Sequence, residues 1–77
     1  MTSEAAEYST MRGSDVRRDG MYVELIENST GDEVAEVFCS DVTHEMSITV
    51  FKHDLPLHAV EMLIARAKVD LPPTNAP

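Results

Sequence analysis

The sequence predicts an α+β domain in which a three-stranded antiparallel β-meander, in the order 1-2-3, packs against one C-terminal α-helix. Three observations predict it: three short segments of alternating or β-branched character, turn-forming residues between them, and one later segment of helical period. A chain of 77 residues has room for one domain. We expect residues 20–71 to form the βββα domain, residues 1–19 a disordered N-terminal arm, and residues 72–77 a disordered proline-rich tail.

Residues 21–27, 33–39 and 46–52 are the three expected strands. Alternation divides each of them between two faces of a sheet. The uniformly apolar face is expected to pack on the helix, and its members are Val23, Leu25, Ala35, Val37, Cys39, Met46, Ile48 and Val50.

The two turns predict the register of the sheet. Ser29-Thr30-Gly31 suits a three-residue loop with glycine at positive φ, which pairs Asn28 with Asp32. The pairs that follow are Ile26–Val34, Leu25–Ala35, Glu24–Glu36, Val23–Val37 and Tyr22–Phe38. A four-residue loop over 41–44 then pairs Cys39 with Met46, Val37 with Ile48 and Ala35 with Val50.

The helix is expected to follow Asp54 as N-cap, with Pro56 in its first turn, and to end before Pro72-Pro73. Its apolar residues recur at helical spacing and predict a core-facing stripe of Leu57, Val60, Leu63, Ile64, Ala67 and Leu71.

Charge excludes some classes of function. Residues 20–71 hold ten acidic and three basic residues, a formal net charge of −7, which disfavours binding to nucleic acid. No apolar run has the length of a membrane span or a signal peptide, and a single cysteine suits a reducing compartment, so we expect a cytoplasmic protein.

The motifs of catalysis and cofactor binding are missing from the sequence. Its glycines form no phosphate-binding loop, and His44, His53 and His58 lack the spacing of a metal site. Cys39 is expected on the core face, where a thiol is inert. We therefore expect neither an enzyme nor a cofactor nor a bound metal.

The face of the sheet away from the helix is unusually apolar, and it is the predicted site of partner binding. Aromatic residues surround two opposed glutamates there, an arrangement typical of interaction surfaces. Its members are Tyr22, Glu24, Ile26, Val34, Glu36, Phe38 and Phe51. Two other interpretations stay open: the N-terminal arm covers this face, with an arginine reaching the glutamates, or the face is simply exposed.

The sequence thus predicts a small acidic interaction or regulatory module that binds a protein partner or itself as a homodimer. The small core favours self-association, since a domain of this size is marginal alone. The alternative is an acidic inhibitor, similar in role to an antitoxin, that masks a basic surface on its partner.

Overall fold

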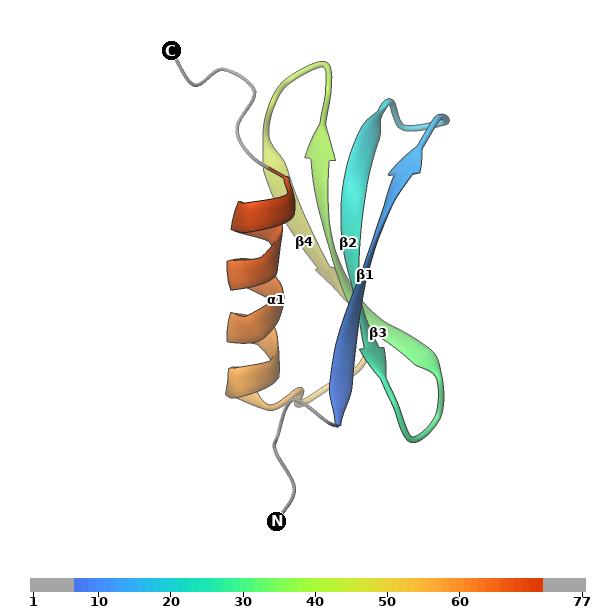
Figure 1. Cartoon of the computed structure of the whole chain (residues 1–77), viewed down its shortest axis with the longest axis vertical. Coiled ribbons are helices and arrows are strands. Elements are labelled where there is room, and N and C mark those ends of the chain that lie inside the picture. Colours follow the sequence, from blue (N-terminus) through green and yellow to red (C-terminus); the bar gives the residue numbers. More distant parts are fainter. Residues whose placement is uncertain (1–6, 72–77) are drawn as a thin grey trace.

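The computed structural model describes residues 7–71, which form an antiparallel sheet covered on one face by a helix (Figure 1). The elements are β1 (Tyr8–Asp15), β2 (Gly20–Glu27), β3 (Asp32–Ser40), β4 (Met46–Val50) and α1 (Leu57–Asp70). The strands lie in the order β1-β2-β3-β4, so every connection joins neighbours. The expected α+β class, the meander and the C-terminal helix are confirmed.

The prediction of three strands is wrong, because part of the expected disordered arm forms β1, which pairs along its whole length with β2. The chain reverses through residues 16–19, where the Asp15 carboxylate accepts the backbone N–H groups of Arg17 and Arg18. Asp19 then adopts a positive φ of 53° ahead of Gly20. An Asp-Gly pair is a strong hairpin signal. Residues 1–6 and the predicted tail at 72–77 lie outside the described residues.

The register between β2 and β3 follows the prediction from Leu25–Ala35 to Tyr22–Phe38. It departs at the turn, where Ile26 pairs with Glu33 and Glu27 with Asp32, so the predicted pairs Ile26–Val34 and Asn28–Asp32 are wrong. A bulge between Leu25 and Ile26 absorbs the difference and leaves Val34 as the additional residue of β3. Gly31 has the expected positive φ, 78°.

The predicted pairing of β3 with β4 is confirmed throughout, from Cys39–Met46 to Ala35–Val50. The loop between them is held by Ser40, whose hydroxyl accepts the N–H groups of Val42 and Thr43 at 3.1 Å each. The strand ends at Val50, two residues before its predicted end.

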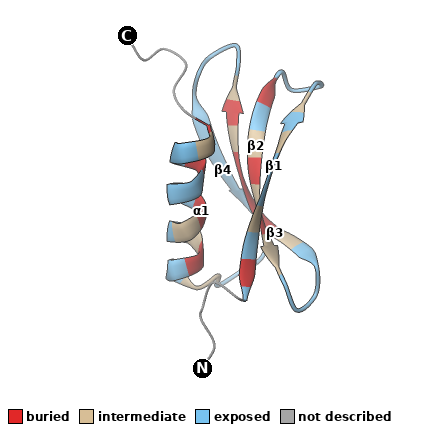
Figure 2. Cartoon of the chain, viewed as in Figure 1, coloured by how far each residue is buried: buried red, intermediate tan, exposed pale blue. Residues whose placement is uncertain are grey.

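Helix α1 begins later than predicted. Asp54 has a positive φ of 57°, which is incompatible with an N-cap, and Pro56 occupies the N-cap position instead. The residues buried against the sheet are Ala59, Leu63 and Ala67, at intervals of four, with Leu71 following (Figure 2). Leu57, a member of the predicted stripe, is 72% exposed.

The core therefore lies under the first three strands. Val23, Leu25, Ala35, Val37 and Cys39 are buried as predicted. The packing of α1 is chiefly on β1, β2 and β3, so all five residues of β4 stay exposed and the predicted burial of Met46, Ile48 and Val50 is wrong. Within residues 7–71, no helix has the length and apolar character needed to cross a membrane.

Candidate functional site

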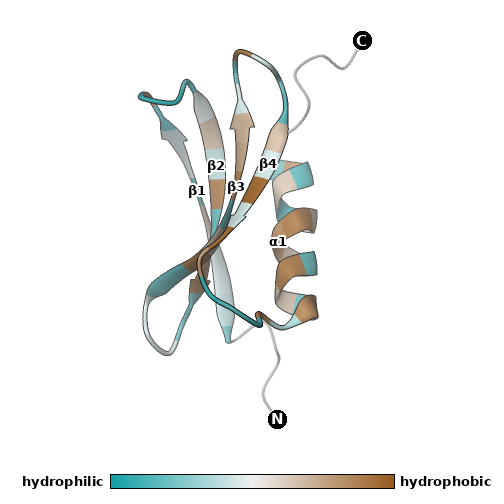
Figure 3. Cartoon of the chain, turned by 180° about the vertical axis from the view of Figure 1, so that it is seen from behind, coloured by the Kyte–Doolittle hydropathy of each residue, from teal (hydrophilic) through white to brown (hydrophobic). Residues whose placement is uncertain are grey.

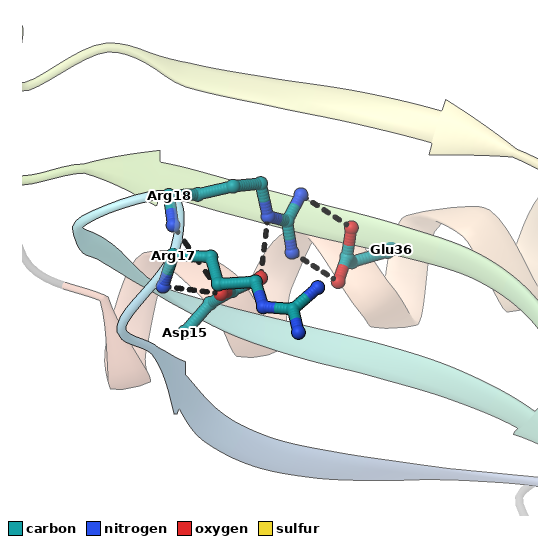
Figure 4. A network of polar contacts seen from close by, with 4 residues as sticks. All are labelled: Asp15, Arg17, Arg18 and Glu36. Atoms are coloured by element: carbon teal, nitrogen blue, oxygen red, sulfur yellow. Dashed lines mark hydrogen bonds and ion pairs between the residues drawn. The ribbon is translucent and has the colours of Figure 1, made fainter.

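The first candidate site is the sheet face opposite α1, and Arg18 from the β1–β2 turn dominates it (Figure 4). Its Nη1 and Nη2 donate to the two carboxylate oxygens of Glu36 at 3.1 and 2.9 Å, while Nε donates to Asp15 at 2.6 Å. The guanidinium carbon also lies 4.2 Å from the centre of the Phe38 ring. This geometry combines a bidentate ion pair with a cation–π contact.

Arg18 explains how a glutamate is buried in a domain this small. Glu36 is 8% exposed, and a buried carboxylate is tolerated when it is paired and hydrogen-bonded. The side-chain hydrogen bond from Arg18 also lowers the pKa of Asp15. The structure thus places an arginine from residues 1–19, the expected arm, on the predicted face. This agrees with the interpretation in which an arginine of the arm reaches the glutamates.

Aromatic rings cover glycines on this face. Tyr22 lies opposite Gly13 of β1, and a Cβ atom at Gly13 would come within 2.5 Å of the Tyr22 hydroxyl oxygen. The Phe38 ring occupies the corresponding space above Gly20. Both rings are therefore partly buried by neighbouring backbone.

Three carboxylates gather on the same face. Oxygens of Glu24, Glu33 and Glu36 all lie within 4.8 Å of one another. Burial, followed by the negative charges of Glu24 and Glu36, raises the pKa of Glu33. The sequence predicted the Glu24–Glu36 pair; it missed Glu33, because only the bulge brings that residue next to them.

The other residues of the predicted site are dispersed. Val34 is buried at 3% exposure and belongs to the core cluster. Phe51 follows the end of β4 and is 57% exposed. Tyr22, Glu24, Ile26 and Phe38 are half-buried. No observation tests partner binding by these residues, and it stays a prediction.

The second candidate site is the apolar strip that α1 leaves uncovered (Figure 3). We define the β4 strip as Met46, Ile48 and Val50 of β4 with Ile64 of α1, which are 38%, 45%, 51% and 39% exposed. A groove of about 200 Å³ runs between the strand and the helix. It is lined by Val37, Met46, Ser47, Ile48, Ile64, Ala67 and Lys68.

The outer edge of β4 adds backbone groups to this strip. Phe51 donates its N–H to Val34, and Glu45 accepts one from Ser40, so odd-numbered residues face β3. Hydrogen bonding alternates along an antiparallel strand. The N–H and C=O groups of Met46, Ile48 and Val50 therefore point away from β3, on an edge with no neighbouring strand among the described residues.

The sequence predicted that the residues of the β4 strip are buried. Alternation indicates which residues share a face of the sheet, but it does not indicate how many strands one helix covers. The remaining chemical candidate, Cys39, is buried. Comparison of the chain with protein-family models, with curated proteins and with solved structures finds no match.

Proposed function

We propose that this chain is a small, non-enzymatic protein–protein interaction module that self-associates and that acts through the β4 strip. A single observation carries the proposal: exposed apolar side chains and outward-pointing backbone groups occur together on one strand. An exposed strand edge is a ready template for pairing with another chain.

The charge distribution supports the same surface. The chain has a formal net charge of −8, but β4 itself contains no charged residue. Lys68 borders the groove. A protein partner therefore meets an uncharged, apolar strand here, on a chain whose net charge is strongly negative.

The experiment is capture of proteins from native lysate on the immobilised chain, with two lysine variants of β4. Ile48→Lys places a charge in the strip, whereas Thr49→Lys is its matched control on the opposite face of the same strand. We expect the captured set to be lost with I48K and retained with T49K. Equal capture by the two variants would exclude the β4 strip as the interaction surface.

The carboxylate cluster favours a second candidate, an acidic inhibitor that masks a basic partner surface. Oxygens of Glu24, Glu33 and Glu36 lie within 4.8 Å of one another, and the pKa of Glu33 is raised first by burial and then by the charges of Glu24 and Glu36, which a partner cation would offset. The test is capture at low and at high salt by the wild type and by Glu33→Gln. Charge-led binding is lost at high salt and weakened by E33Q, and capture that ignores both changes rejects this candidate.

A further inference from the structure

We propose that the partner of the β4 strip is a second copy of this chain, and that the two β4 strands pair antiparallel about a two-fold axis at Ile48. This inference rests on the proposed function and names its partner and its register. The resulting dimer has one continuous sheet with both α1 helices on the same face.

The register follows from the hydrogen bonds of the monomer. Within β4, only Met46, Ile48 and Val50 direct their backbone groups outward, so these residues must form the hydrogen-bonded pairs with the second copy. Centring the axis on Ile48 uses all of them, because Ile48 then faces Ile48 of the other copy and Met46 faces Val50. Each such pair exchanges two hydrogen bonds. Axes at Met46 or Val50 overlap fewer residues of the strand.

The side chains suit this register on both faces of the sheet. On the face that carries α1, Ile48 meets Ile48 and Met46 meets Val50, which are apolar cross-strand pairs without charge. On the opposite face Ser47 meets Thr49, two exposed hydroxyl residues. The grooves of the two copies would join into one apolar surface between the two helices.

The uncharged edge of β4 suits a second copy, because two chains that each carry a formal net charge of −8 meet there without setting like charges against each other. Helix α1 runs antiparallel to β4 (Figures 1 and 3), so the two-fold axis places the Lys68 end of one helix opposite the beginning of the other. Glu61 lies seven residues before Lys68, two turns earlier on a similar face. The two helices therefore present Lys68 and Glu61 in opposite order on the two sides of the joined grooves, so like charges do not lie opposite each other.

The other free edge is less suited to pairing. Strand β1 carries Arg12, Gly13 and Asp15, and charged residues and glycine weaken an edge for pairing. Pairing of β1 with β4 of another copy would also be heterologous and would not close into a dimer. Pairing of β4 with itself closes, which limits assembly to two copies.

The interface is small. Five residues that rise about 3.4 Å each give a line of contact of about 17 Å. We expect a contact line this short, even with the groove beside it, to bury less area than the roughly 800 Å² per partner of a standard stable interface. We therefore expect a reversible dimer whose population depends on concentration.

Sedimentation equilibrium from low micromolar to near-millimolar concentration, in physiological salt, is the first test. We expect the mass to rise from 8.5 kDa toward twice that value. Ile48→Lys should keep the monomer mass throughout, and Met11→Lys, at an exposed apolar residue of β1 on the far edge of the sheet, should dimerise like the wild type. A wild type that stays monomeric over the whole range overturns the proposal, as does an I48K variant that dimerises normally.

Disulfide trapping tests the register itself, in a Cys39→Ala background. Ser47 and Thr49 of opposite copies would have Cα atoms about 4.5 Å apart, a distance that a disulfide spans. A mixture of Ser47→Cys and Thr49→Cys chains should cross-link, whereas each variant alone should not, because its own copies are offset by two residues. Cross-linking of either variant alone, or none in the mixture, overturns the register.

Different results contradict the second copy and the interaction module. A monomeric wild type whose capture of other proteins is abolished by I48K and kept by T49K contradicts the second copy, and with it the self-association, while supporting a module that binds other proteins through the β4 strip. A dimer unaffected by I48K, together with capture unaffected by I48K, contradicts both.

Discussion

Leu63 and Ile64 are neighbours in α1, and replacing each by alanine measures which face of the helix holds the core. Leu63 is completely buried, whereas Ile64 is 39% exposed beside the groove. Truncating a fully buried leucine costs about 3 kcal/mol, within the usual 2 to 5 kcal/mol for such sites. Ile64→Ala removes contacts on one side only, and we expect it to cost about 1 kcal/mol or less.

A domain of this size makes the difference large. At about 0.05–0.15 kcal/mol per residue, a small domain such as this has a total stability of about 3–10 kcal/mol. Leu63→Ala therefore removes a large share of it. At about 4–8 °C per kcal/mol, the expected fall in Tm is about 12–24 °C for L63A and at most about 8 °C for I64A.

The assay is thermal and urea unfolding followed by circular dichroism at low protein concentration, where self-association contributes least to stability. An osmolyte such as trimethylamine N-oxide keeps L63A folded if it is marginal in buffer. A cost for I64A equal to or above that for L63A would refute the packing of α1 described above, because it would mean that the helix turns Ile64 into the core.

Three further perturbations test the face that Arg18 covers. Arg18→Ala should lower Tm, because it leaves the buried Glu36 without its bidentate partner. The control Arg17→Ala keeps the backbone hydrogen bond to Asp15 and should change Tm little. Equal changes in Tm for the two variants would argue against the ion pair. Glu33→Gln should match the wild type near pH 4 and exceed its stability in urea at pH 7. The reason is that the folded state raises the pKa of this carboxyl, so the wild type loses stability as pH rises from the ordinary value of 4.5 through the folded-state pKa. A difference in unfolding free energy between the two proteins that stays constant across this range would contradict the prediction. Gly13→Val should destabilise the β1–β2 hairpin by displacing the Tyr22 ring, to be measured as faster amide exchange in β1.

Local sequence patterns determined most of the strand pairing in this protein. Alternation and loop length set the register of β3 with β4 and of β2 with β3 as far as Leu25–Ala35, because a shift of one residue would turn every apolar side chain to the wrong face. The positive φ of Gly31 follows from the same turn chemistry. For this reason the sequence could predict that Glu24 and Glu36 lie opposite each other.

Strand β1 escaped prediction because its buried surface is almost entirely Tyr8, which packs edge-to-face on His58 of α1. A strand whose stability comes from backbone pairing with β2 leaves little hydrophobic pattern in its sequence. The Asp19-Gly20 pair was the available signal of a hairpin. The arginine that neutralises the glutamates could be placed only after that hairpin was known.

The sequence by itself determined the class of the fold, the β2-β3-β4 meander and the presence of a terminal helix, since these depend on period and turn chemistry within short segments. The tertiary structure alone decided where α1 lies across the sheet. Helical period defines an apolar stripe, but the small side chains of Ala59 and Ala67 set the close approach, which centres the helix on the first three strands. That choice leaves β4 exposed, and with it the surface through which we propose this chain finds its partner.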